Sequence, residues 1–376
     1  MSQKGVLMSK QSDLTAKSSQ FVALDTIRAL AAIVVFLGHV RIVSFVSWEN
    51  LATEYKTLGA TLFYAVARLG QDAVLVFFVL SGFFVGGQMI ARMKQGQFRI
   101  SDYATDRATR LLLPLVPACV LTLAVSYLAM GNLDEASNVM ASLLGLNGVF
   151  VETSNFNLPL WSIAFEIWFY VAAGAFASAW SGAGRPVAFL VMLASAYVFS
   201  ILNIAFLLFW VIGAAIFLAR AHLRKPLFFV VGIAIAGIAA ILFELHDAGP
   251  DIMLRDKAIH LQALICIGFA IAIPYLTSET LNDKLQPFAK ASAFLAASSY
   301  SLYVFHYPVL MLISLYVPKV ETFGPMALVY FGLISLAVFS ICLGLWFLFE
   351  RQTDTVRRMI KGMRRNHGRS MSAKPV

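Results

Sequence analysis

The stretch LDTIRALAAIVVFLGH, from Leu24 to His39, places an aspartate, an arginine and a histidine inside an apolar segment of membrane-spanning length. A charged group near the centre of a bilayer costs at least roughly 2.5–3.5 kcal/mol on insertion scales, so each of the three needs a partner or a role. His39 follows Arg28 by eleven residues. On a helix this spacing puts both side chains on one face, about 16 Å apart along the axis. Asp25, one turn before Arg28, is expected to pair with it.

Apolar stretches of this kind recur along the whole chain. The protein has 376 residues, a mean hydropathy of +0.78 and 13% charged residues, whereas a soluble protein carries about 25%. The transmembrane domain is expected at 21–350, between a polar cytoplasmic tail at 1–20, interpreted as disordered, and a basic cytoplasmic tail at 351–376. We expect an all-α membrane protein with about ten transmembrane helices, at residues 22–46, 70–91, 111–130, 159–178, 186–202, 204–220, 227–244, 259–277, 291–316 and 326–349.

Lysine and arginine are distributed unevenly between the segments that join these spans. If the N-terminus lies inside, the inner segments collect most of the 29 basic residues, and the outer segments hold only Arg41, Lys56, Arg68, Arg255, Lys257 and Lys319. The positive-inside rule then places both termini in the cytoplasm. The net charge of +9 reflects this topology and indicates no nucleic-acid partner, and the basic tail contacts at most anionic membrane lipids. The stretch SILNIAF predicts one tight turn between the fifth and sixth spans, on which the sidedness of all later spans depends.

The three cysteines, Cys119, Cys266 and Cys342, all fall within apolar runs. Their spacing fits neither a metal site nor a disulfide in a loop, so they are interpreted as small buried apolar side chains. The sequence holds no Walker loop and no dinucleotide-binding fingerprint after a strand-like segment, which argues against nucleotide hydrolysis. We expect no bound metal.

Three ionisable residues on different expected helices share a depth in the outer half of the membrane. Pro159 suits the first turn of a helix that enters from outside, and Glu166 then lies roughly 10 Å along it. His306 comes late in a span that runs outward, and His39 comes late in the first span. Each can be interpreted as a residue that joins two helices through a hydrogen bond, or all three as parts of one site.

The cytoplasmic side carries a second group of polar residues. DRATRLLLP puts Arg107 and Arg110 three residues apart at the expected start of a helix, where guanidinium and free N–H groups suit phosphate. The alternative is that both are ordinary positive-inside anchors. In GQDAVLVFFVLSGFFVGG, Ser81 lies near mid-depth, and Gly82 and the glycines that follow it allow close approach by another helix or by a slender ligand.

These motifs occur in an order that resembles the acyltransferase-3 family of integral membrane acyltransferases. RALAAIVVFLGH resembles its Arg-x10-His signature at Arg28 and His39, and FFVLSGF its Phe-Phe-x-x-Ser-Gly element. RATR resembles its Arg-x-x-Arg element, PLWSIAFEIWFY its Trp-Ser-x-x-x-Glu-x-x-Phe-Tyr element, and YSLYVFHYPV its late Tyr-Ser-x-Tyr-x-x-His-x-Pro element. The five elements cover most of the chain and are specific in combination.

The resemblance implies transfer of an acyl group, usually acetyl, from acyl-CoA to a hydroxyl, most often on a carbohydrate or glycoconjugate. It also implies the plasma (inner) membrane of a bacterium. Some relatives carry two acidic residues in the fourth element, whereas Glu166 is followed here by Ile167. Others carry an appended hydrolase-like domain for which this chain has no room, so transfer should be completed within the membrane domain.

Donor binding is expected from the inside, where CoA occurs. The phosphates of acetyl-CoA should meet Arg107, Arg110 and Arg28, and the pantetheine arm should pass beside Ser81 and Gly82. The thioester would then reach His39. These expectations combine the depths of the residues with the function that the resemblance implies.

For the chemistry, we expect His39 to act as general base on the acceptor hydroxyl, with Glu166 orienting its imidazole. The oxyanion donor is left open between His306, Tyr303 and Ser162, and an acyl-histidine intermediate is an alternative to direct attack. A function of another class also fits a membrane His and Glu: a proton-coupled transporter with His39, Glu166 and His306 as its relay. Such a transporter should show inverted internal repeats, which the sequence does not.

Overall fold

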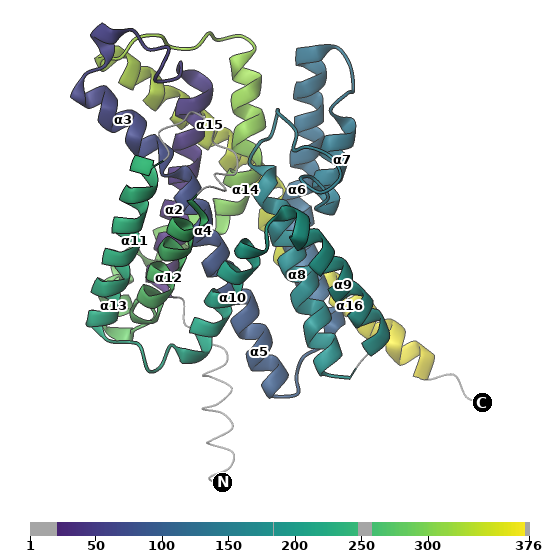
Figure 1. The fold of residues 1–376 in the computed structure, drawn as a ribbon. Helices are drawn as coiled ribbons and strands as arrows, with labels where there is room; N and C mark the ends of the chain where they lie inside the picture. Colours follow the sequence, from purple (N-terminus) through teal and green to yellow (C-terminus); the bar gives the residue numbers. More distant parts are fainter. Residues whose placement is uncertain (1–20, 183, 247–257, 373–376) are drawn as a thin grey trace.

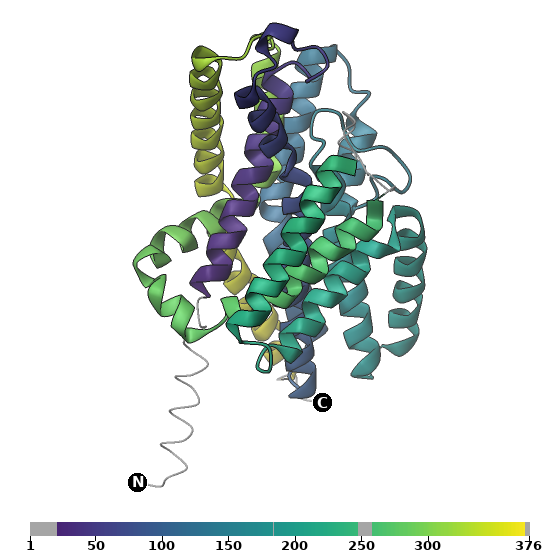
Figure 2. The ribbon, with the colours of Figure 1, turned by 60° about the vertical axis from the view of Figure 1, so that its left-hand side comes forward.

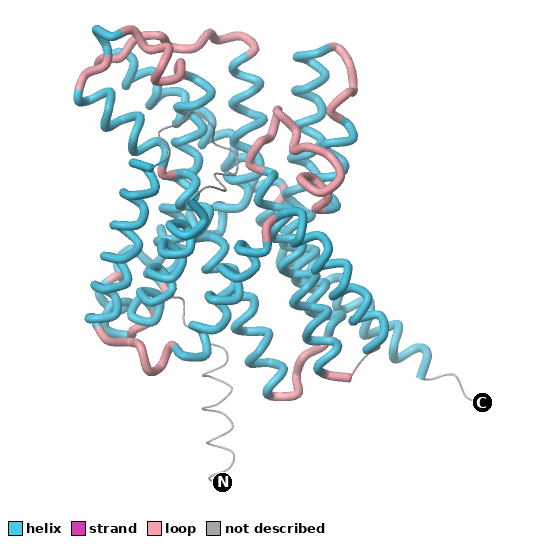
Figure 3. The backbone as a smooth tube through the Cα atoms, viewed as in Figure 1, coloured by secondary structure: helices cyan, strands magenta, loops and turns pink. Residues whose placement is uncertain are grey.

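The computed structural model describes residues 21–182, 184–246 and 258–372. Within these ranges the chain is a bundle of helices joined by loops, with isolated bridges between Phe45 and Val320 and between Asn147 and Val151 but no strand (Figure 3). The expected all-α membrane fold is therefore confirmed. The tail expected at 1–20 lies outside the described residues.

All ten expected spans coincide with helices. Among the described residues, eight helical stretches are long and apolar enough to cross a membrane: Val22–Ser44 (α2), Leu58–Lys94, Ile100–Met130 (α6), Leu160–Trp180 (α8), Arg185–Leu202 (α9), Pro226–Leu245 in α11 (Pro226–His246), Ile259–Leu276 (α12) and Pro325–Arg364. The other two expected spans correspond to α10 (Ile204–Ala219), which is shorter, and to α14 (Ala289–Ser314). The tight turn expected between spans five and six is present, because only Asn203, with φ of 105°, separates α9 from α10.

The centre of the bundle is formed by α2, which packs against α14 on one side and α4 (Gly70–Ser81) on the other (Figure 1). Helices α11 and α12 pair at one flank, and α8 and α9 pair at the other (Figure 1). In Figure 2 the molecule is turned so that α11 and α12 come to the front. Helices from the beginning (α2) and from the end (α14) of the chain therefore lie side by side. Cys119, Cys266 and Cys342 are buried and free, as their apolar surroundings predicted.

The second expected span, 70–91, is part of a longer helical run. Helix α3 (Leu58–Arg68) leads into α4, a π-helical segment (Gly82–Gly86) and α5 (Gly87–Lys94). A Cβ built on Gly82 would lie 1.8 Å from the carbonyl oxygen of Trp210, and one on Gly213 would lie 2.0 Å from that of Val79. The glycines therefore allow α10 to approach the backbone of α4, and of the two interpretations, helix packing is the one observed at Gly82.

Helix α6 starts at Ile100 rather than near residue 111. The expectation that Arg107 and Arg110 stand at a helix N-terminus is therefore wrong: Arg107 lies seven residues inside, roughly 10 Å from the free N–H groups. The turns of α6 before residue 111 are held in place by α16 (Thr353–Ser372), whose Arg364 donates to the carbonyl oxygen of Ser101 at 2.8 Å. Residues 353–372 of the basic tail are thus helical and lie along the start of α6.

Candidate active site

Two histidines from opposite ends of the sequence meet in the bundle. Nδ1 of His39, on α2, lies 3.0 Å from Nε2 of His306, on α14, and the ring centroids are 5.0 Å apart. Nδ1 of His306 lies 2.8 Å from the carbonyl oxygen of Leu302. A carbonyl only accepts, so Nδ1 of His306 carries a proton, and the Nε2 of the neutral ring is then an acceptor. His39 must donate to it through Nδ1, which leaves a lone pair on Nε2 of His39.

The two rings differ in their access to solvent. His306 is fully buried, with 0% exposure, whereas His39 is half-buried and lines a cavity that comprises about 540 Å³ of empty space, part of it open to the outside. We call this the outer cavity. It lies between the end of α2 and the start of α4, and its other polar walls come from Arg41, Arg68, Gln71, Trp161 and Tyr303. Only the half-buried ring can therefore reach a molecule in this cavity.

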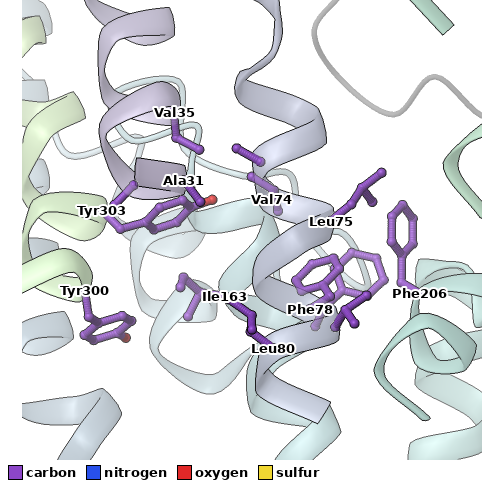
Figure 4. Packing of buried hydrophobic residues seen from close by; sticks show 14 of the residues in the cluster. Ala31, Val35, Val74, Leu75, Phe78, Leu80, Ile163, Phe206, Tyr300 and Tyr303 are labelled. Carbon is purple, nitrogen blue, oxygen red and sulfur yellow. The ribbon is translucent and has the colours of Figure 1, made fainter. Parts of the chain in front are cut away.

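A second cavity, the central cavity, comprises about 930 Å³ of empty space, part of it open to the outside. Figure 4 shows part of its wall: Tyr300 and Tyr303 project from α14 toward the side where Ile163 of α8 and Val74 and Leu80 of α4 lie. Val74 and Tyr303 line the outer cavity as well, so the two cavities share a wall. The polar residues of the central cavity are Arg28, Ser81, Arg107, Arg110, Ser162, Glu166, Tyr170, Ser299, Tyr300 and Tyr303.

Glu166 lines the central cavity, but its hydrogen-bond partner is not a histidine. Its carboxylate accepts a short hydrogen bond from the hydroxyl of Tyr170. Ser81 donates to that hydroxyl at 3.5 Å and accepts from the indole nitrogen of Trp210 at 3.1 Å. A chain of polar groups therefore joins α8, α4 and α10, and the place expected for Glu166 beside His39 is taken by His306.

The three predicted arginines all line the central cavity, and each has a different partner. Arg28 pairs with Asp25 at 2.7 Å, as the one-turn spacing predicted. Arg107 stacks over the ring of Tyr170 at 5.5 Å, and its buried Nε has no hydrogen-bond partner in the described part of the chain. Arg110 forms an ion pair with Glu350. A negative ligand in this cavity would therefore face three guanidinium groups, of which Arg107 has no carboxylate partner among the residues that the structure describes.

Glu350 was not identified from the sequence. It is 3% exposed, and besides Arg110 it accepts hydrogen bonds from the backbone nitrogen and the hydroxyl of Ser301, at 2.9 and 2.6 Å. It thereby ties the end of α15 (Pro325–Leu348) to α6 and α14. Its position directly after the last apolar run was a possible signal, but an acidic residue there also fits an exposed helix end.

The hydroxyls of Ser162 and Tyr303 lie 2.6 Å apart in the wall of the central cavity. Each is also within 3.2 Å of the carbonyl oxygen of Pro159. Ser81 lines the same cavity, whereas Gly82 does not and is covered by α10. Of the residues predicted for the donor, Gly82 is thus the one that the structure places away from this cavity.

Apolar helices, two adjoining cavities with polar residues in their walls and an oriented histidine pair define a membrane protein with a site suited to acid–base chemistry. The sequence matches the family model described as an acyltransferase domain over residues 21–347, nearly the whole chain. The protein therefore belongs to the acyltransferase-3 family and is a multi-pass membrane acyltransferase. Comparison with curated proteins and with solved structures returned no match. Family membership supports the enzyme over the transporter that the sequence left as an alternative.

Proposed function

We propose that the protein transfers an acyl group, acetyl by preference, from cytoplasmic acyl-CoA to a hydroxyl of a carbohydrate or glycoconjugate at the outer face of a bacterial plasma membrane. The observation that carries this proposal is the histidine pair. His306 accepts from Nδ1 of His39, which leaves the lone pair on Nε2 of His39 available as a base. His39 lines the outer cavity, which adjoins the arginine-rich central cavity at Val74 and Tyr303.

The central cavity suits the acyl donor. Its arginines, Arg28, Arg107 and Arg110, offer positive charge to a polyanionic thioester, and Arg107 has an unpartnered buried donor that an anion would satisfy. Glu166 holds Tyr170, over whose ring Arg107 lies. In this proposal Glu166 positions the donor-binding residues, and His306 takes over the orientation of His39.

The outer cavity suits the acceptor. It combines the indole of Trp161 with the amide of Gln71 and the guanidinium groups of Arg41 and Arg68. An apolar ring with a few convergent polar groups is the composition typical of a small-ligand site. A sugar hydroxyl in this cavity would face His39, while the acyl carbonyl would arrive from the central cavity.

The proposed reaction needs one base and one oxyanion donor. Nε2 of His39 takes the proton of the acceptor hydroxyl while its oxygen bonds to the acyl carbonyl carbon. The tetrahedral intermediate then breaks the carbon–sulfur bond, and the CoA thiolate takes the proton from His39, which gives an ester and free CoA. Tyr303 lines both cavities and shares a hydrogen bond with Ser162, so its hydroxyl is the proposed donor to the oxyanion.

The experiment is acetyl-CoA turnover by the purified protein in lipid nanodiscs, with water or crude polysaccharide as acceptor and free CoA thiol as the readout. Direct binding of CoA is measured in parallel. The variants are His39→Gln and Arg107→Gln, with His222→Gln as the matched control, because His222 lines neither cavity.

Loss of turnover in His39→Gln with CoA binding retained, together with weaker CoA binding in Arg107→Gln, would support the proposal. If His39→Gln turned over like the wild type, the base would be misassigned. A wild-type protein that neither bound CoA nor released its thiol would refute the proposed donor.

A further inference from the structure

A third cavity adjoins the central one near the loop between α5 and α6. It comprises about 830 Å³ of empty space, part of it open to the outside, between the end of α5, the loop 95–99, the start of α6 and α16. We call it the inner cavity. Phe84, Val85 and Arg107 line both the inner and the central cavity. The inner, central and outer cavities therefore follow one another through the bundle, each sharing residues with the next.

The charge of the inner cavity is predominantly positive. Its walls hold the acidic Asp102 and Asp106 and the basic Arg92, Arg99, Arg107 and Lys361. Arg92 and Arg99 are exposed, and the buried Nε of Arg107 has no hydrogen-bond partner. Several guanidinium and ammonium groups around an open space are the arrangement that binds phosphate groups.

Asp106 organises these cations. Its carboxylate lies 2.6 Å from Nζ of Lys361, 3.4 Å from Nε of Arg357 and 4.0 Å from Arg92. One carboxylate therefore faces three positive groups, which leaves a local excess of positive charge that a bound anion would neutralise. The contact also fixes α16 against α6 and brings Lys361 to the cavity wall.

An aromatic surface lies beside the charged groups. Phe98 and Tyr103 both line the inner cavity, with ring centroids 5.8 Å apart. Tyr103 is buried and donates its hydroxyl to the carbonyl oxygen of Tyr170, whereas Phe98 is half-buried. A half-buried ring next to phosphate-binding groups can stack on a nucleobase, which is worth about 1–3 kcal/mol per base in nucleic-acid binders.

We propose that the inner cavity binds the phosphorylated nucleotide end of the CoA donor, with Lys361, Arg92 and Arg99 on its phosphates and Phe98 beside its base. The proposal rests on the proposed function, because it needs CoA as donor. It extends that function to a segment the family comparison does not cover, since the matched region ends at residue 347 and Lys361 lies on α16. The phosphate of an anionic lipid head group has the same chemistry and is the rival source.

The experiment compares two acetyl donors, acetyl-CoA and S-acetylpantetheine, which lacks the nucleotide. Wild type, Lys361→Gln and Arg92→Gln are assayed in nanodiscs of zwitterionic lipid and again with anionic lipid added. Arg358→Gln is the matched control, because Arg358 has the same charge on the same helix but is exposed and does not line the cavity. The kcat and the KM for each donor are measured.

We expect Lys361→Gln and Arg92→Gln to raise the KM for acetyl-CoA about tenfold each, the loss typical of one charge-assisted hydrogen bond. The kcat, and the KM for S-acetylpantetheine, should stay at wild-type values, as should every parameter of Arg358→Gln. A KM that rose equally for both donors would overturn the proposal in favour of a general distortion of α6 and α16. So would an unchanged KM for acetyl-CoA.

Two further results distinguish nucleotide binding from lipid binding in the inner cavity and from a failure of the proposed function. An effect of the variants that occurs only in nanodiscs with anionic lipid would assign the inner cavity to a lipid head group and overturn the proposal. A wild-type protein that acetylates from neither donor would refute the proposed function itself, and the inner cavity as its nucleotide site with it. Wild-type turnover with unaffected variants would refute the inner cavity alone.

Discussion

His39 and His306 are 267 positions apart in the chain, yet Nδ1 of the first lies 3.0 Å from Nε2 of the second. The contact joins α2 to α14, the two helices at the centre of the bundle. Because His306 also contacts the carbonyl oxygen of Leu302 on its own helix, both rings have one defined arrangement of protons. The first two predictions below follow from this pair.

The first prediction concerns His39. Substitution His39→Gln keeps a polar group of similar reach but removes the basic nitrogen. We expect kcat for acyl transfer to fall by about 10²–10⁴-fold, the usual contribution of a general base, with the KM for the donor little changed. Steady-state kinetics of CoA release measure both. Activity within a few-fold of wild type would show that another group accepts the proton.

A second prediction separates orientation from packing at His306. The Oε1 atom of a glutamine can replace the acceptor Nε2, whereas a leucine fills the space without accepting a hydrogen bond. We therefore expect His306→Gln to retain at least about ten times the kcat of His306→Leu, as for the loss of one buried hydrogen bond. If the two variants were equally impaired and equally folded by size-exclusion chromatography, His306 would act by packing alone.

Glu350 leads to a prediction about stability. Glu350→Ala leaves Arg110 and the buried polar groups of Ser301 without their acceptor, which for a buried pair costs about 3–5 kcal/mol. A clearly lower apparent melting temperature in detergent should follow. Asp354→Ala is the control. The side chain of Asp354, which pairs with Arg357, is 81% exposed, and exposed ion pairs contribute about 0–1 kcal/mol to the free energy of unfolding.

The double variant Arg110→Met/Glu350→Met tests the same pair from the other side. Removing both charges should restore much of the melting temperature lost in Glu350→Ala, because replacing a whole buried ion pair is often neutral. CoA binding by the double variant should be weaker than in the wild type, since Arg110 lines the central cavity. Full recovery of CoA binding would contradict a role for Arg110 in the donor site.

Close packing of α4 and α10 provides a further prediction. In Gly82→Ala the new Cβ would lie 1.8 Å from the carbonyl oxygen of Trp210, so the helices must separate. We expect a low yield of folded protein. Gly237→Ala, on α11, is the control, because a Cβ there meets nothing within 4 Å. Similar yields for both variants in fluorescence-detected size-exclusion chromatography would contradict the observed packing.

Much of the fold follows from local properties of the sequence. Each apolar run of sufficient length forms a helix, because the bilayer leaves the backbone no other partner for its hydrogen bonds. The pairing of Asp25 with Arg28 needed only the helical repeat. The start of α6 at Ile100 could not be read from hydropathy, since residues 100–110 are polar and are held by contacts with α16, about 250 positions later.

The partners within the site depend on how the helices are arranged, which no local pattern encodes. The similar depth expected for these residues in the membrane correctly grouped His39 with His306. It could not show whether His306 or Glu166 is the neighbour of His39. That choice depends on the rotation of α8, which places Glu166 in the wall of the central cavity with Arg107 and Arg110. The hydrogen bond of Glu166 to Tyr170 is itself a local contact, because the two residues are one turn apart on α8. Glu350 was missed for the same reason: only tertiary packing carries Arg110 to it.

The wall that the central and outer cavities share has a second consequence. A row of cavities from one face of a membrane to the other would, if joined, let protons and ions flow down their gradients and de-energise the cell. Val74 and Tyr303 stand where the two cavities adjoin. We therefore expect these two side chains to contribute to the permeability barrier of the membrane, so that smaller side chains at both positions would let protons and ions leak through the protein.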